Sequence, residues 1–209
     1  MSRALILVDL QHDFLPGGAL AVPDGDAVLP VARAVMPAFE HVVATQDWHP
    51  ADHGSFASRN PGASPGEMGE LAGLPQVMWP DHCVQETRGA EFALELPEHV
   101  KVFQKGTDTS VDSYSGFFDN DRRTDTGLGE YLKALGITSV YVMGLATDYC
   151  VRFTALDARS LGFETFLITD GCRGVELNTG DCAKALEQMA EAGVQLIDSA
   201  TLEPTMAGG

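Results

Sequence analysis

Six short runs of apolar residues, rich in Val and Ile, recur along the chain and constrain its fold more than any other feature. They lie at residues 4–8, 41–45, 100–104, 139–143, 165–168 and 194–197. Near-continuous hydrophobicity over this length is typical of strands that are covered on both faces. The runs therefore predict the strands of a parallel sheet.

Helical patterns lie between these runs. Apolar residues recur at helical spacing within residues 28–39, 128–135, 151–161 and 182–190, and the last three patterns stop at Gly136, Gly162 and Gly193. Glycine is suited to the left-handed conformation that ends many helices. Strands that alternate with helices predict an α/β fold, a doubly wound three-layer sandwich with a six-stranded, mainly parallel sheet.

The length and net charge of the chain limit the classes of function that it can have. A chain of 209 residues is expected to form a single domain over residues 1–209. Its formal net charge of −17 repels phosphate backbones and anionic lipid, so we expect no nucleic-acid partner and no membrane partner. No apolar stretch approaches the roughly 20 residues of a spanning helix, and the start of the chain does not resemble a signal peptide. We therefore expect a cytoplasmic protein.

One long segment interrupts the alternation. Residues from about 50 to 98 are rich in Pro, Gly, Ser and Asn and show no long periodic pattern. Loops longer than roughly 12–15 residues within a compact domain are usually functional or disordered. This segment carries His53, Trp79 and His82, so we expect it to contribute to a site.

Chemically active residues follow the predicted strands. Asp9 ends the first strand, Lys105 follows the third, and Cys150 comes after the fourth at the start of a helix. Ligands of open parallel sheets bind outside the carboxyl ends of the strands, so these residues are expected to converge. The helix start favours a thiolate at Cys150, and a thiolate, an acid and an ammonium are what nucleophilic acyl transfer requires. Taken singly, Cys150 could be a buried apolar residue, and Asp9 with Lys105 a solvated ion pair.

A metal site is predicted beside these residues. Asp47 and His49 alternate on an extended segment and so share a face, and His82 could supply a third ligand. A mixture of His and carboxylate suits Zn²⁺, Fe²⁺ or Mn²⁺, among which the sequence does not choose. His53 is left open as a ligand, a hydrogen-bond partner of a ligand, or a loop histidine. Asp-x-His alone is a weak signal that often marks a surface turn.

Six motifs together resemble a known family. They are Val8-Asp9-Leu10-Gln11-His12-Asp13-Phe14, Asp47-Trp48-His49-Pro50, Trp79-Pro80-Asp81-His82-Cys83, Lys105-Gly106, Asp112-Ser113-Tyr114-Ser115 and Gly144-Leu145-Ala146-Thr147-Asp148-Tyr149-Cys150. In this order, and over residues 4 to about 198, the chain closely resembles the nicotinamidase/pyrazinamidase family of the isochorismatase-like cysteine hydrolase superfamily.

The resemblance implies a role for each reacting group. It implies a catalytic triad of Asp9, Lys105 and Cys150, and an oxyanion hole made by the backbone N–H groups of Ala146 and Cys150. It also implies a cis peptide bond between Leu145 and Ala146, and it places Leu145 in substrate binding.

The resemblance also implies a cofactor and a ring site. One divalent metal ion, Zn²⁺ first with Fe²⁺ or Mn²⁺ as alternatives, would be held by Asp47, His49 and His82 and would bind the ring nitrogen of the substrate. Phe14 and Trp79 would sandwich the ring. From the residues alone, Phe14 and Trp79 could equally be loop anchors packed on the core.

The implied activity is hydrolysis of nicotinamide, and of pyrazinamide-like aromatic carboxamides, to nicotinate and ammonia through a cysteine thioester, feeding NAD salvage. Dimers are common in this fold family, so a homodimer is expected, although the sequence does not locate an interface. Two alternatives remain. The chain could be a sister amidohydrolase that acts on another small amide or on isochorismate, or a non-catalytic metal-binding or thiol redox module.

Overall fold

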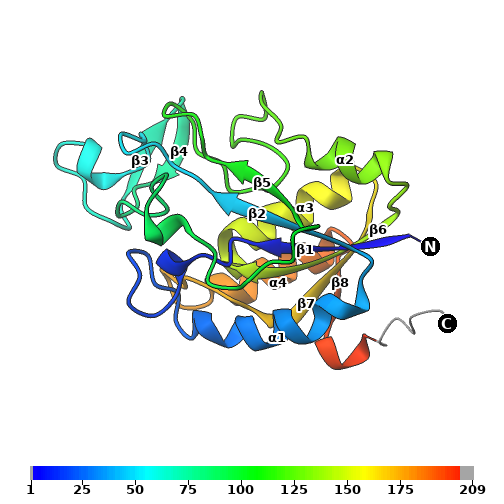
Figure 1. Ribbon diagram of the computed structural model, residues 1–209. Coiled ribbons are helices and arrows are strands. Elements are labelled where there is room, and N and C mark those ends of the chain that lie inside the picture. The colour runs from blue at the N-terminus through cyan, green and yellow to red at the C-terminus, as the bar shows by residue number, and fades with distance from the viewer. Residues whose placement is uncertain (1, 203–209) are drawn as a thin grey trace.

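The computed structural model describes residues 2–202 and contains one six-stranded sheet (Figure 1). Its strands lie in the order β5-β2-β1-β6-β7-β8, and every neighbouring pair is parallel. They span Lys101–Lys105 (β5), His41–Asp47 (β2), Arg3–Val8 (β1), Ser139–Leu145 (β6), Glu164–Arg173 (β7) and Gln195–Ile197 (β8). The six predicted strands and their parallel arrangement are confirmed.

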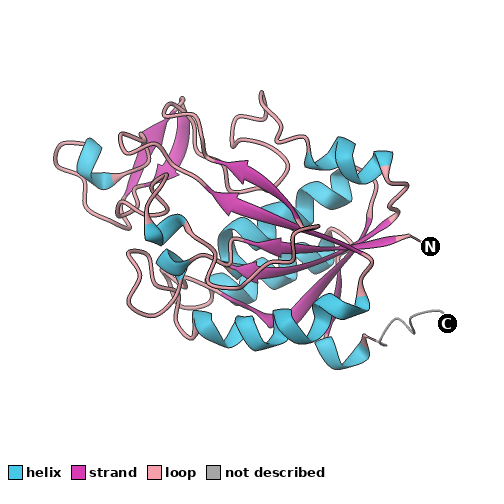
Figure 2. Cartoon of the chain, viewed as in Figure 1, coloured by secondary structure: helices cyan, strands magenta, loops and turns pink. Residues whose placement is uncertain are grey.

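Helices cover both faces of this sheet (Figures 1 and 2). The α-helices are α1 (Val28–Val35), α2 (Leu128–Ala134), α3 (Arg152–Ser160) and α4 (Asp181–Glu191). Helix α1 lies on one face and the other three lie on the opposite face, as right-handed crossovers require when the chain winds in both directions from β1. The predicted helix ends at Gly136, Gly162 and Gly193 are confirmed, with φ of 69°, 91° and 86°.

Short helical turns complete the secondary structure. A π-helical turn, Thr147–Val151, leads from β6 into α3. The 3₁₀ turns are His12–Phe14, Gly25–Ala27, Met36–Ala38, Ala57–Arg59, Arg88–Ala90 and Ser199–Thr201.

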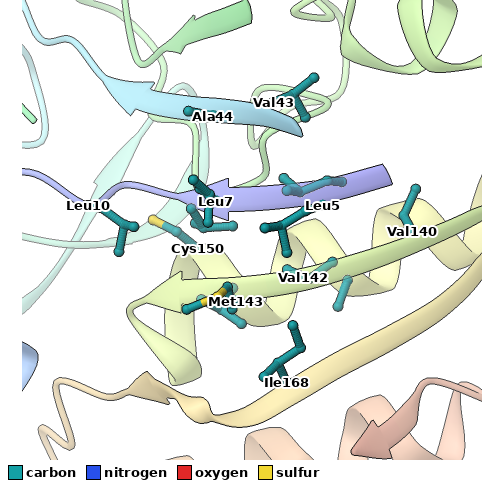
Figure 3. Packing of buried hydrophobic residues seen from close by; sticks show 14 of the residues in the cluster. Leu5, Leu7, Leu10, Val43, Ala44, Val140, Val142, Met143, Cys150 and Ile168 are labelled. Atoms are coloured by element: carbon teal, nitrogen blue, oxygen red, sulfur yellow. The ribbon is translucent and has the colours of Figure 1, made fainter. Parts of the chain in front are cut away.

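The central strands form the core. Leu5 and Leu7 of β1 and Val142 of β6 are at most 1% exposed. They belong, with Ile168, to the hydrophobic cluster that fills both sides of the sheet (Figure 3). Cys150 lies at the edge of the same cluster, beyond the end of β6. Burial of this kind stabilises a fold by about 25 cal/mol per Å² of apolar surface, so the ends of β1 and β6 are firmly held.

The long segment after β2 contains structure that the sequence did not predict. Strands β3 (Met68–Leu71) and β4 (Leu74–Val77) form an antiparallel hairpin that lies apart from the main sheet (Figure 1). Ala72 and Gly73 connect them, with φ of 54° and 75°. Positive φ at both turn residues is the geometry that closes a two-residue hairpin. The expectation of a segment without regular structure is therefore wrong for residues 68–77.

Two sequence-based expectations concern the whole chain. The predicted single domain reaches residues 1 and 203–209, which lie outside the described residues. Within residues 2–202, no helix has the length and apolar character needed to cross a bilayer. Cys83, Cys150, Cys172 and Cys182 are all free thiols.

Candidate active site

Three reactive groups from three different strands meet at the carboxyl edge of the sheet. Asp9 follows β1, Lys105 ends β5, and Cys150 lies in the π-helical turn after β6. Lys105 Nζ is 3.0 Å from Asp9 Oδ2 and 3.4 Å from Cys150 Sγ. Asp9, Lys105 and Cys150 are 0%, 2% and 7% exposed, so the structure brings the three predicted residues together in a buried site.

The ammonium of Lys105 uses all its hydrogens on other partners. It donates to Asp47 Oδ1 at 2.9 Å, to the carbonyl of Ser113 at 2.9 Å and to Cys150 Sγ. The Oδ1 atom of Asp9 accepts a 2.6 Å hydrogen bond from Thr45 Oγ1, whereas Oδ2 has no hydrogen-bond partner among the described residues. Asp9 Oδ2 thus forms an ion pair with Lys105, and the Asp9 carboxyl also faces the Cys150 thiol.

Burial sets the protonation of these groups. Burial raises the pKa of the Cys150 thiol well above its ordinary value; Lys105 opposes this, and the carboxylates of Asp9 and Asp47 add to it. Burial also raises the pKa of Asp9, against the charge of Lys105. Desolvation therefore acts against the thiolate that the helix start favours at Cys150. The resting site instead pairs a thiol with a carboxylate of increased basicity.

Asp47, His49 and His82 converge beside this group. Asp47 Oδ2 lies 3.1 Å from His49 Nε2 and 3.3 Å from His82 Nε2. The Nδ1 atoms of the two histidines lie 2.9 Å from the carbonyl of Gly106 and 2.8 Å from that of Pro80. A carbonyl only accepts hydrogen bonds, so each Nδ1 carries the hydrogen, and in the neutral ring the Nε2 lone pair faces the carboxylate. Three electron-pair donors aimed at one another fit a cation.

The charge balance supports the same conclusion. Asp9, Asp47 and Asp112 are buried at this edge of the sheet, and Lys105 is the buried ammonium beside them. Ionised, these four groups leave two negative charges in excess, which is costly in a buried site unless a counter-charge is present. A divalent cation supplies that counter-charge, so the residues present fit a divalent metal.

Gln11 holds the backbone of Asp47, one of the three convergent residues. Its amide accepts from the N–H of Asp47 at 2.8 Å and donates to the carbonyl of Asp47 at 2.7 Å. The same amide donates to the carbonyl of Ala90 at 2.9 Å, which ties the strand end to the long loop. Gln11 lies in one of the motifs that carry the family resemblance, but its role was not predicted.

His53 packs against the cluster with both ring nitrogens engaged. Its Nδ1 accepts from the N–H of Ser55, and its Nε2 lies 3.3 Å from the carbonyl of Val111. The ring centroid is 4.2 Å from that of His49. This ring contact places His53 beside His49, and the donor atoms of His49, His53 and Asp112 form a second group close enough to hold a cation. The alternatives that the sequence leaves open for His53 therefore stay open.

A small pocket lined by Cys150, Asp47 and His82 opens beside the reactive groups. Phe14 and Trp79 both line it, as predicted, and so do Tyr114 and Tyr149, which sequence reasoning missed. Both tyrosines lie within the motifs, so their position beside the reactive residues was the available signal.

Leu145 and Ala146 differ in their position relative to the cavity. Ala146 lines the cavity, and the peptide bond between the two residues is cis, as expected. Leu145 is fully buried at the end of β6 and is not among the residues that line the cavity. Its side chain fills the core, so the structure does not place it against a substrate.

A doubly wound parallel sheet with a thiol, a carboxyl and an ammonium at its carboxyl edge defines an α/β enzyme of the cysteine hydrolase class. The sequence model of the isochorismatase domain matches residues 3–201. The chain belongs to the isochorismatase family.

Within this family, the chain is similar to nicotinamidases. It is 52% identical to the nicotinamidase of Escherichia coli K12 over 97% of this chain and 98% of that protein. The structure of a nicotinamidase/pyrazinamidase of Acinetobacter baumanii matches with a TM-score of 0.93 and 46% identity, covering 97% of this chain and 98% of the other. The pyrazinamidase of Pyrococcus horikoshii in complex with zinc matches with a TM-score of 0.79 and 40% identity, covering 95% and 99%.

Proposed function

We propose that this protein hydrolyses nicotinamide, and pyrazinamide-like aromatic carboxamides, to nicotinate and ammonia. The observation that carries the proposal is the contact of Lys105 with both Asp9 and Cys150 at a cavity walled by aromatic rings. Similarity to nicotinamidases over nearly the whole chain supports the choice of substrate.

The first half of the reaction forms a thioester. Asp9 takes the proton of the Cys150 thiol, and the sulfur attacks the carboxamide carbon. The negative charge that develops on the carbonyl oxygen is stabilised by the backbone N–H groups of Ala146 and Cys150, each worth roughly 3–4 kcal/mol in a preorganised site. When the carbon–nitrogen bond breaks, Asp9 returns its proton to the nitrogen, and ammonia leaves.

The second half releases the acid. Asp9 now takes a proton from water, the resulting hydroxide attacks the thioester carbon, and the carbon–sulfur bond breaks. The sulfur recovers its proton from Asp9, which restores the resting state. Lys105 keeps its positive charge throughout, because Asp47 and Asp9 outweigh burial and hold its pKa well above the ordinary value.

Asp47, His49 and His82 would hold the metal ion, which we propose to be Zn²⁺. Two imidazole nitrogens and one carboxylate oxygen form a donor set that Zn²⁺ accepts with a coordination position left for a further ligand. When bound, the ion supplies a Lewis-acidic positive charge that can hold a substrate ring nitrogen. The Nδ1 hydrogen bonds to Gly106 and Pro80 keep both histidines oriented for it.

Removal of the metal is expected to abolish turnover and to lower the melting temperature. The stripped site leaves Asp47 facing two imidazole lone pairs with two excess negative charges, and a ligand that binds only the folded state stabilises it. Ammonia release, metal content and thermal unfolding are measured before chelation, after it, and after readdition of Zn²⁺, Fe²⁺ or Mn²⁺ in separate samples. Turnover that survives complete metal loss would contradict the metal's role.

Ammonia release from nicotinamide by the purified holoenzyme tests the proposed function directly. Release from nicotinamide and pyrazinamide is the expected result. Release only from another small amide, or turnover of isochorismate instead, would identify a sister hydrolase. A protein that binds metal or oxidises at Cys150 but turns over none of these substrates would be a binding or redox module.

Three further expectations belong to this proposal. We propose that the product nicotinate feeds NAD salvage, that the enzyme works in the cytoplasm, and that it forms a homodimer. Light scattering coupled to size exclusion checks the last of these, with a particle of twice the mass of one chain as the expected result.

A further inference from the structure

The hairpin outside the main sheet contributes one buried amide to the region of the cavity. Gln76 of β4 is 3% exposed. Its Nε2 lies 2.8 Å from Asp112 Oδ2 and 3.0 Å from Tyr114 Oη, and it also lies 2.8 Å from the carbonyl of Val77. Gln76 contacts none of the three reacting groups, and the mechanism described above does not use it.

Tyr114 connects this amide to the cavity wall. Its hydroxyl oxygen lies 3.0 Å from Gln76 Nε2 and accepts a hydrogen bond from Trp79 Nε1 at 3.2 Å. The two amide hydrogens of Gln76 serve three acceptors, so the hydroxyl oxygen shares one of them with Asp112 or with the carbonyl of Val77. The hydroxyl therefore holds the indole of Trp79 in a position that the amide of Gln76 helps to define.

The rings of this wall brace one another. Trp79 packs edge-on against Tyr149 with centroids 4.8 Å apart, and Tyr114 packs against the same ring at 5.4 Å. All three rings line the cavity. Such contacts leave some freedom to slide and tilt, whereas directional hydrogen bonds at the Tyr114 hydroxyl fix one arrangement.

We propose that Gln76 is a positioning residue for substrate binding, which acts through the Tyr114 hydroxyl to fix Trp79 in the wall that receives the aromatic ring. This inference rests on the proposed function, because the ring to be held is that of nicotinamide. Gln76 touches neither Asp9, Lys105 nor Cys150, so its loss should affect KM far more than kcat.

Replacement of Gln76 by leucine tests the inference, because leucine has a similar volume and no N–H donor. With Trp48→Phe as the background, Trp79 is the remaining one of the two tryptophans, and its fluorescence reports its surroundings. We expect Q76L to shift Trp79 emission to longer wavelength, to increase its quenching by acrylamide, and to raise KM for nicotinamide about tenfold with kcat within about twofold. The melting temperature is measured for every variant.

Two further variants separate positioning from general stability. Tyr114→Phe removes the shared oxygen, so it should give the same shifts as Q76L, and the double variant should add little to either. Gln195→Leu, which removes an exposed amide bonded to Glu164 at 3.2 Å on the far edge strand, should leave emission and KM unchanged.

The outcomes are distinct. A lower melting temperature in Q76L with unchanged emission and KM would give Gln76 a merely structural role and overturn the inference, as would a loss confined to kcat. If wild-type protein releases no ammonia from nicotinamide, the proposed function fails, and the substrate assigned to this wall fails with it. Wild-type turnover combined with an unchanged KM in Q76L overturns only the role of Gln76.

Discussion

Replacement of Cys150 by alanine is expected to reduce ammonia release from nicotinamide by about 10⁴-fold or more. In hydrolases that use a covalent intermediate, loss of the nucleophile alone removes nearly all the catalysis that the whole triad provides. Cys150 Sγ is the sulfur in contact with Lys105, and it lies at the cavity. Removing this sulfur leaves water as the only attacking group, without an activated path to the carboxamide.

The experiment separates chemistry from binding and folding. Single-turnover ammonia release gives the rate, calorimetric titration gives the affinity for nicotinamide, and thermal unfolding checks the fold. Affinity should remain, because Phe14 and Trp79 are untouched. Cys182→Ala is the matched control, since Cys182 is a half-buried thiol of α4 outside the cavity, and it should change turnover by no more than about twofold. Near-wild-type turnover in C150A would refute a covalent mechanism.

Replacement of Asp9 by asparagine is expected to lower kcat by about 10²–10⁴-fold, the range that general acid–base catalysis contributes. Asparagine keeps the shape of the side chain and can still accept the hydrogen bond from Thr45, but it cannot take the thiol proton. Asp9 has a φ of 50°, a left-handed conformation that asparagine adopts readily, so the backbone should be unaffected. The chemical step should therefore fail in a folded protein.

A second aspartate provides a stringent control for D9N. Asp24 also has a left-handed backbone, with φ of 53°, but it is exposed in a loop. Asp24→Asn should leave kcat and KM within about twofold of wild type. Steady-state kinetics and thermal unfolding are compared for both variants. A rise in KM alone for D9N, with kcat preserved, would contradict the assignment of Asp9 as the general base.

Much of the architecture could be predicted because it depends on local patterns. Strands β1, β2 and β6 are almost entirely buried and appear as continuous apolar runs, whereas the edge strands β5 and β8 are largely exposed. Three helices end at glycines with positive φ. The hairpin of β3 and β4 was missed for a physical reason. Each strand has four residues, β4 contains Pro75, and several of their side chains face solvent, so no hydrophobic periodicity marks them.

The site was less predictable where it depends on distant contacts. Asp9, Lys105 and Cys150 could be placed together because strand ends of a parallel sheet share one edge. The protonation state of Cys150 could not be predicted from the sequence, because it depends on how deeply the folded chain buries the thiol and on the carboxylates that face it. Gln76 and Tyr114 meet across 38 positions of sequence, and no local pattern links them.

The separation of the β3–β4 hairpin from the main sheet bears on how such an enzyme can evolve. The groups that break the amide bond lie at the ends of buried strands, where most substitutions would disrupt the core. Gln76 and Trp79 instead belong to the long segment after β2, which lies apart from the main sheet and in which substitutions disturb the core less. Substitutions in that segment can therefore reshape part of the wall that receives the ring while Asp9, Lys105 and Cys150 stay in place.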